Sequence, residues 1–321
     1  MARTRLYRHG NLEAADFEVD DVSEHLKDPD AVVWVDFHSP TESDLAAIGA
    51  ELGLHELAIE DALAEHERPK FDRYEGHWFL SAKAVRFDAD GTLAPTEVAA
   101  FITDRALVTV HADQFDFDDV LQRWDDTTDL VKVGVGYLVH GLLDSIVDGH
   151  LNAARQLDDE IEALEESLFE ERPNHREMQH RALRLRKNLV VLRRVEMPMA
   201  DVVAALLRKD QNLVDDALRP YFQDVYDHVL RVTDWTDSLR EMTTTLRETQ
   251  LTVQGNVLNM IMKKVTSWAA IIAVPTAITG FYGQNVPYPG FQEPWGFWVS
   301  TVVILGLSFG LYVGFKRRDW L

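Results

Sequence analysis

Cysteine is absent from the 321 residues of this chain. Disulfides, cysteine-based zinc sites and thiol nucleophiles are therefore excluded. The sequence also lacks a Gly-rich phosphate loop and a visible catalytic triad, so neither a bound nucleotide nor an enzyme is indicated. No apolar stretch follows the first five residues, which argues against a secretory signal. These absences favour a protein without an organic cofactor, whose only route into a membrane is through internal segments.

Basic residues are scarce, with 32 Lys and Arg against 54 Asp and Glu, and the formal net charge is −22. The excess of acid is confined to residues 1–255, because residues 256–321 contain five basic and two acidic residues. An acidic body repels phosphate, which excludes nucleic acid as a partner. It suits a body that concentrates cations. Solubility or adaptation to salt is the plainer explanation, and charge alone leaves both open.

Residues 1–125 are predicted to form an α/β domain with a mixed sheet. Short apolar runs typical of buried strands occupy residues 32–37, 78–85, 98–103 and 107–111. Residues 43–52 and 55–64 are predicted helices, and Ser43 is the predicted N-cap of the first. The order of strands and helices indicates an α+β arrangement at the N-terminus.

From residue 126 onward the pattern becomes helical and highly charged. Residues 126–213 are predicted to form an antiparallel pair of charged helices, since apolar residues recur there at helical spacing. A stalk helix follows at residues 214–258, and neither Gly nor Pro interrupts the chain between Pro220 and Gly255. If it continues across Gly255 it spans roughly 60 residues, on the order of 90 Å. A helix of that length requires packing partners, which predicts an oligomeric bundle.

Two stretches near the C-terminus are uncharged and suited to crossing a bilayer. Residues 265–282 are largely apolar, and residues 295–315 are rich in Val, Leu, Gly and aromatic residues. Crossing about 30 Å of hydrocarbon requires roughly 20 helical residues. The second stretch meets this length directly, whereas the first meets it only if its start, around residues 260–264, lines a wet interior or snorkels. We therefore predict transmembrane helices at residues 259–282 and 295–315.

Charge at the ends of these helices predicts their orientation. Lys263 and Lys264 lie at the start of the first helix, and the tail at residues 316–321 begins Lys-Arg-Arg. The external loop at residues 283–294 carries only Glu293. The positive-inside rule places both termini and the acidic body in the cytoplasm, in a protein of the plasma (inner) membrane. Two helices cannot enclose a pore, so conduction requires several subunits around a common axis.

Four blocks of sequence occur in a characteristic order. Residues 59–63 read Ile-Glu-Asp-Ala-Leu, and residues 219–228 read Arg-Pro-Tyr-Phe-Gln-Asp-Val-Tyr-Asp-His. Tyr282-Gly283-Gln284-Asn285 opens the loop, and Lys-Arg-Arg-Asp-Trp-Leu ends the chain. From residue 30 to residue 321 the chain resembles the CorA-type magnesium transporter family, in which Gly-Met-Asn follows the first span. The resemblance implies a funnel-shaped homopentamer with cytoplasmic α+β domains, long stalk helices and a two-helix transmembrane hairpin in each subunit.

The resemblance also implies which residues line a passive, potential-driven pore for Mg²⁺, and for Co²⁺ or Ni²⁺. The matching positions of the first span are Asn259, Met262, Val265, Ala273 and Thr276. Gly283, Gln284 and Asn285 match the mouth, where neutral oxygens bind a hydrated ion without stripping its waters. From the residues alone, the mouth could merely cap the helix and the stripe could merely pack. Gln284 stands where the family has Met, which leaves the preferred ion open.

Acidic residues of the body match the family's regulatory metal site. Asp61 and Asp224 correspond to residues that meet across a subunit boundary there and bind a divalent cation. Facing carboxylates repel unless an ion lies between them, so cytoplasmic Mg²⁺ would tie subunits together and favour the closed pore. Glu60 and Asp148 are weaker members, and Asp144 could take the place of Asp148. Asp61 and Asp224 could instead be helix caps or solvated charges, and the twelve His show no convincing ligand spacing.

Two other functions remain open on the sequence. A zinc transporter of the same superfamily, with or without proton coupling, is consistent with Gln284. A membrane-anchored helical scaffold that conducts no ion would use the hairpin only as an anchor. The two polar positions, Asn259 in the first span and Asn285 just beyond its outer end, argue against the scaffold. An Asn in a span is costly unless it faces protein or water, which favours Asn259 facing the lumen.

Overall fold

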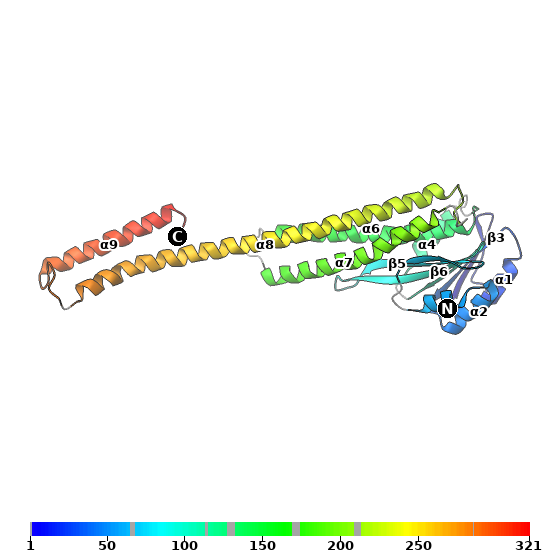
Figure 1. The fold of residues 1–321 in the computed structure, drawn as a ribbon, viewed down its shortest axis with the longest axis horizontal. Helices are drawn as coiled ribbons and strands as arrows, with labels where there is room; N and C mark the ends of the chain where they lie inside the picture. The colour runs from blue at the N-terminus through cyan, green and yellow to red at the C-terminus, as the bar shows by residue number, and fades with distance from the viewer. Residues whose placement is uncertain are drawn as a thin grey trace. The chain divides into compact units, whose positions relative to one another are not determined.

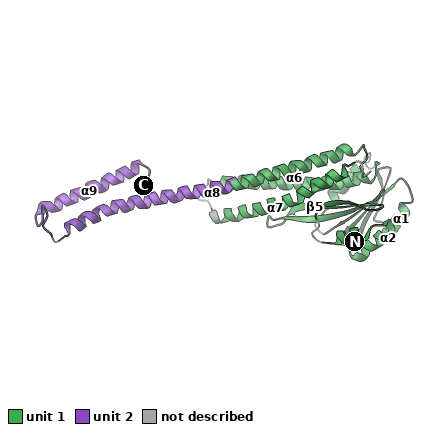
Figure 2. Ribbon diagram, viewed as in Figure 1, with its two compact units in different colours: residues 1–244 green, residues 245–321 purple. Residues whose placement is uncertain are grey.

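The computed structural model describes residues 2–64, 68–112, 115–126, 132–168, 174–208, 213–284 and 286–321. The chain divides into two compact units, residues 1–244 and residues 245–321 (Figure 2). The first unit contains the β-sheet and most of the helices. The second contains the end of one long helix, a loop and a final helix.

A seven-stranded sheet lies in the first unit (Figure 1). Its strands are β1 (Ala2–Arg8), β2 (Asn11–Ala15), β3 (Ala31–His38), β4 (Lys70–Arg73), β5 (Trp78–Phe87), β6 (Leu93–Ile102) and β7 (Ala106–His111), in the order β2-β1-β3-β7-β6-β5-β4. β3 and β7 pair in parallel, and the other five pairings are antiparallel. The predicted mixed sheet and its four predicted strands are confirmed, and β1, β2 and β4 are additional.

Both faces of the sheet are covered by helices. Alternate residues of a strand point to opposite faces, so Val33 and Val35 pack in one buried layer and Trp34 packs in the other. The first layer includes residues of α2 (Glu42–Leu52) and α3 (Glu56–Leu63), with the short α1 (Val22–His25) beside them. The second includes residues of α4 (Asp118–Asp126), α6 (Val135–Leu168), α7 (His175–Leu206) and the start of α8 (Arg219–Tyr282).

The N-cap of α2 differs from the predicted one. Thr41, rather than Ser43, precedes the helix: its hydroxyl accepts a hydrogen bond from the amide of Asp44, and the Asp44 carboxylate accepts one from the amide of Thr41. This reciprocal capping box satisfies two amide groups that the helix itself leaves free. Ser43 cannot supply the cap, because it already lies inside the first turn.

α6 and α7 form an antiparallel pair that is fastened to the sheet. Glu160 of α6 accepts a hydrogen bond of 2.9 Å from Arg181 of α7. His150 of α6 lies 2.7 Å from the carbonyl of Lys83 on β5. Asn188 of α7 accepts a hydrogen bond from the amide of Leu93 and donates one to the carbonyl of Gly91. These two bonds hold the turn between β5 and β6 against α7. The fixed pair presents one side to α8 (Figure 1).

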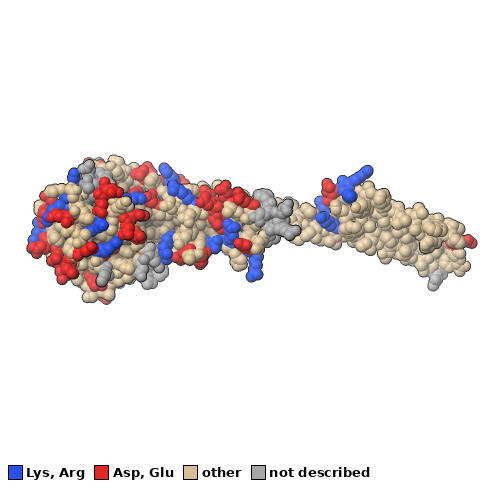
Figure 3. Space-filling model, turned by 180° about the vertical axis from the view of Figure 1, so that it is seen from behind, with Lys and Arg blue, Asp and Glu red and all other residues tan. Residues whose placement is uncertain are grey.

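The predicted continuous helix is confirmed, since α8 runs through Gly255 and Pro275 for 64 residues. A loop joins it to α9 (Pro294–Arg317), which has 24 residues. Both helices are long and apolar enough to cross a membrane. Figure 3 shows the contrast in charge: side chains of both signs crowd the surface of the first unit, while most of the second unit carries none. The exposed apolar surface of the second unit fits lipid or further protein rather than water.

Candidate functional site

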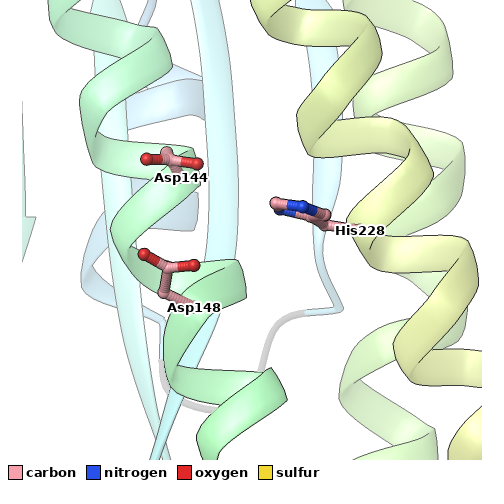
Figure 4. A group of neighbouring side chains, drawn as sticks. All are labelled: Asp144, Asp148 and His228. Atoms are coloured by element: carbon pink, nitrogen blue, oxygen red, sulfur yellow. The ribbon is translucent and has the colours of Figure 1, made fainter.

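Two acidic residues and a histidine converge in the first unit (Figure 4). Asp144 and Asp148 lie one turn apart on α6, and His228 faces them from α8. One ligand atom of each residue lies within 4.8 Å of the others. Because α6 and α8 pack through buried residues such as Leu142 and Val225, the two helices hold the three side chains at this spacing. We refer to Asp144, Asp148 and His228 as the stalk cluster.

Arg123 of α4 lies against the two carboxylates of the stalk cluster. It forms an ion pair with Asp144 and donates a hydrogen bond of 2.7 Å to Asp148. Burial raises the pKa of Asp144 above its ordinary value, and the neighbouring charge of Asp148 raises it further. The hydrogen bond with Asp148 raises the pKa of Arg123. The carboxylates are thus crowded enough to need a positive charge beside them, and Arg123 provides it.

Two more side chains border the stalk cluster. Asp224 lies one turn before His228 on α8, with its carboxylate 3.9 Å from His228 Nε2 and most of its side chain exposed. Burial lowers the pKa of His140 on α6, which keeps that imidazole neutral. Carboxylate oxygens suit Mg²⁺, and an imidazole suits Co²⁺, Ni²⁺ or Zn²⁺. The donor atoms present therefore fit a divalent cation, provided that Arg123 releases the carboxylates.

The other predicted regulatory residues lie on α3. Glu60 is exposed there and Asp61 is half-buried, and the carboxylate of Asp61 lies 2.8 Å from Nζ of Lys70. Asp148 is brought together with Asp144, and both lie beside His228 and Asp224. The pairing of Asp61 with Asp224 from a neighbouring subunit stays a prediction.

Sequence reasoning missed His228 and Arg123. The two helical spacings of four residues, 144 to 148 and 224 to 228, were the available signal, because such residues share a helix face. The spacing of the histidines relative to one another carried no signal, because His228 meets carboxylates from a different helix. Arg123 carries no local signal, since its partners lie more than twenty residues away on α6.

The predicted pore-lining residues share one side of α8 in the second unit. Asn259, Met262, Val265, Ala273 and Thr276, here called the α8 stripe, are all exposed in the single chain. At 3.6 residues per turn they fall within roughly a third of the circumference of the helix. The stripe therefore combines an amide, a hydroxyl and apolar side chains on one uncovered surface.

The opposite side of the same helix is the covered one. Its less exposed residues are Ser267, Ala270, Ile271, Val274, Pro275, Ile278 and Tyr282. The less exposed residues of α9 include a set that recurs at a helical spacing: Ser300, Thr301, Ile304, Ser308, Leu311 and Phe315. The less exposed faces indicate that α9 packs against the side of α8 away from the α8 stripe. Figure 1 shows α9 running alongside the end of α8.

The predicted mouth follows directly on α8. The amide of Gly283 bonds to the carbonyl of Thr279 at 2.9 Å, and the amide of Gln284 bonds to the carbonyl of Phe281 at 3.3 Å. Both residues are exposed. Asn285, the remaining mouth residue, lies outside the described residues. Gly283 thus makes one more hydrogen bond of the α-helical type, to the residue four positions earlier. Gln284 bonds to the residue three positions earlier, as in a tighter final turn, and this favours an end of α8 at the mouth.

Comparison with known proteins agrees with these features. Residues 29–317 match the family described as CorA-like Mg²⁺ transporter protein. The chain is 30% identical over 316 residues to the cobalt/magnesium transport protein CorA of Thermotoga maritima, covering 96% of this chain and 90% of that protein. It is 27% identical over 288 residues to the zinc transport protein ZntB of Yersinia enterocolitica, covering 88% and 86% respectively.

The fold agrees as well. The complete structure of the CorA magnesium transporter from Methanocaldococcus jannaschii matches with a TM-score of 0.79 and 25% identity, over 100% of this chain and 99% of that one. The family match covers β3 to β7, α8 and α9 together, so it includes most of the body and the apolar hairpin. This chain therefore belongs to the CorA-like Mg²⁺ transporter family, and it is a membrane transporter of divalent cations rather than an enzyme.

Proposed function

We propose that this protein is a homopentameric channel that carries Mg²⁺, and also Co²⁺ or Ni²⁺, passively into the cytoplasm. The observation that carries the proposal is the α8 stripe, which is exposed in the single chain on the side away from α9. Copies of the chain around a common axis would turn this stripe inward and leave α9 outside. Asn259 and Thr276 of this stripe are polar, and a polar side chain in a membrane helix is costly unless it faces protein or water, which supports a stripe that faces inward.

The residue types along the stripe suit a hydrated divalent ion. Rings of Asn259 and Asn285 would supply neutral oxygens at the two ends of the first span. Such oxygens hold the ion's water shell without binding so tightly that the ion never leaves. Met262 and Val265 would form an apolar constriction that closes by dewetting. Inward movement is driven by the membrane potential, which contributes about 4.6 kcal/mol per 100 mV for a divalent ion.

Gating follows from the acidic body. Cytoplasmic Mg²⁺ bound near Asp224, Asp61 and the stalk cluster would neutralise facing carboxylates of neighbouring subunits and favour the closed pore. When cytoplasmic Mg²⁺ falls, repulsion returns and loosens the bundle. Glu60 would contribute a further oxygen from α3. The ion shifts the equilibrium only by the difference in its affinity for the closed and open states.

The expected orientation in the membrane puts the proposed Mg²⁺ sensor of the acidic body in the cytoplasm, where it would respond to cytoplasmic Mg²⁺. Lys263 and Lys264 precede the apolar part of α8, and Lys316 and Arg317 end α9. The positive-inside rule assigns these ends, both termini and the acidic body to the cytoplasm, and the mouth to the outer face of the plasma (inner) membrane.

A flux assay tests the proposal. The full chain is purified, reconstituted in liposomes and exposed to Mg²⁺, Co²⁺, Ni²⁺ and Zn²⁺ in turn under an imposed inside-negative potential. We expect the rate of Mg²⁺ entry to rise with the potential. The rate should fall when Mg²⁺ is also present in the compartment that contains the acidic body. Entry of no ion at all would leave only the non-conducting scaffold.

A Zn²⁺ transporter is the second candidate, favoured by two observations. Gln284 replaces the Met of the magnesium channels at the mouth, and His228 adds an imidazole, a good zinc ligand, to the stalk cluster. Faster entry of Zn²⁺ than of Mg²⁺ in the same liposomes would establish it. Dependence of that entry on a pH gradient at constant potential would show proton coupling.

A further inference from the structure

The loop after α8 folds back and bonds to the end of the helix. The hydroxyl of Tyr288 donates a hydrogen bond of 2.9 Å to the main-chain carbonyl of Tyr282, the last residue of α8. The last four carbonyls of a helix have no amide of the helix to pair with. At the edge of a bilayer an unpaired carbonyl is costlier than in water. Tyr288, which follows the mouth in the sequence, thus supplies a hydrogen-bond donor for the last carbonyl of α8.

The ring of Tyr288 is held on several sides. Its centroid lies 4.9 Å from that of Tyr282, 5.3 Å from that of Phe291 and 6.1 Å from that of Phe281. The Tyr282 and Phe291 rings meet it edge to face, an arrangement that aromatic pairs favour. Packing therefore restricts the rotation of Tyr288 and keeps its hydroxyl aimed at the carbonyl.

The backbone on the far side of Tyr288 is also fixed. The amide of Phe291 bonds to the carbonyl of Tyr288 at 2.9 Å, and the amide of Glu293 bonds to the carbonyl of Gly290 at 3.2 Å. Gly290 has a φ of 91°, and a methyl group on Gly296 would meet the Gly290 carbonyl oxygen at 2.4 Å. Both positions require glycine, and their close approach seats the loop on the first turn of α9.

We propose that Tyr288 is a positioning residue for ion selection at the mouth. The inference rests on the proposed function, in which Gly283, Gln284 and Asn285 form that mouth. These three residues lie in the sequence between Tyr282 and Tyr288, so one hydrogen bond fixes both ends of the short segment that carries them. Neutral oxygens discriminate among ions by their number and spacing. Tyr288 touches no ion and acts by holding that spacing constant.

The test removes one hydroxyl. Y288F keeps the ring and its aromatic contacts but cannot donate to the carbonyl of Tyr282. Y282F is the matched control: it removes a hydroxyl from the neighbouring ring, leaves the accepting carbonyl in place, and deletes no hydrogen bond recorded within the described residues. Wild type and both variants are purified as full chains and reconstituted at equal density in liposomes. The initial rates of Mg²⁺, Co²⁺ and Zn²⁺ entry are measured separately, together with oligomer size and melting temperature.

We expect Y288F to change the ratio of Mg²⁺ to Zn²⁺ entry by about three- to tenfold, the size expected for the loss of one neutral hydrogen bond. Oligomer size and melting temperature should match those of Y282F, whose ratio should equal that of wild type. A Y288F ratio equal to that of Y282F, or an equal loss of all three ions, overturns the positioning role while the channel stands. A wild type that passes no ion overturns the proposed function and this inference with it.

Discussion

Arg123 Nη2 lies 2.7 Å from the carboxylate of Asp148, and the same guanidinium also pairs with Asp144. In the single chain, the positive charge beside Asp144 and Asp148 therefore comes from an arginine side chain. In the proposed sensor Arg123 competes with Mg²⁺ for the same oxygens. The pKa of Arg123 is raised by Asp148, so this competitor stays charged and cannot be titrated away.

Replacing this competitor should strengthen Mg²⁺ binding. In R123Q we expect the Mg²⁺ concentration for half-maximal protection from proteolysis to fall by about three- to tenfold, because a charge-assisted hydrogen bond no longer opposes the ion. R8Q is the control, since Arg8 also bridges two acidic residues, Glu13 and Asp28, neither of which belongs to the stalk cluster. An unchanged midpoint in R123Q would show that Mg²⁺ does not use Asp144 and Asp148.

Reversing the charge of Asp224 should weaken the sensor. In D224K the new ammonium stands where the ion needs an oxygen, and it lies one turn from His228. We expect the protective Mg²⁺ concentration to rise by at least about tenfold, the equivalent of roughly 1.4 kcal/mol, with more flux at high cytoplasmic Mg²⁺. D227K, one turn on and exposed beside Gln223, should behave as wild type. Full protection of D224K at the wild-type midpoint would favour the reading of Asp224 as a solvated charge.

Asn285 should be essential for flux. In N285A the mouth loses an amide oxygen from every subunit, so a hydrated ion finds fewer partners there. We expect Mg²⁺ entry into liposomes to fall to the background rate while the oligomer remains intact. V286A is the control, because Val286 is the exposed next residue and contributes no polar atom from its side chain. Wild-type flux in N285A would remove Asn285 from the mouth and favour a role in ending the helix.

Local patterns determined which parts of the fold the sequence could predict. Uncharged runs of membrane length indicate α9 and the end of α8, and apolar runs indicate the buried β3 and β7. β4 consists of only four half-buried or exposed residues, Lys70–Arg73, and β1 alternates Arg with other residues in its first half. Neither offers a continuous apolar signal, because each strand is buried only in part.

The stalk cluster could not be predicted from local patterns. Asp144 and His228 are more than eighty residues apart, and they meet only because α6 and α8 pack together. The family resemblance predicted metal-ligand roles for Asp224 and Asp148 but carried no information about Arg123. The same holds for Tyr288, whose contact with the carbonyl of Tyr282 depends on how the loop turns.

A buried carboxylic acid connects α7 to the stalk. Glu196 is fully buried, and one carboxyl oxygen accepts a hydrogen bond of 3.0 Å from Thr236 of α8. The other oxygen has no hydrogen-bond partner among the described residues. Arg193, whose positive charge acts on this carboxyl, is engaged by Asp237 at 2.7 Å. Burial raises the pKa of Glu196 to about 8, so the acid is neutral in the folded protein at neutral pH.

Stability should therefore decrease with rising pH. The folded pKa of about 8 lies above the ordinary value of 4.5, so Glu196 contributes full stability below pH 4.5 and loses it progressively up to about pH 8. The loss is on the order of 5 kcal/mol at about 1.4 kcal/mol per pH unit. We expect the melting temperature of E196Q to fall less between pH 5 and pH 8 than that of wild type, because the amide does not titrate. E165Q, at an exposed position of α6, should retain the wild-type slope, and parallel curves for wild type and E196Q would show that Glu196 is already ionised in the folded state.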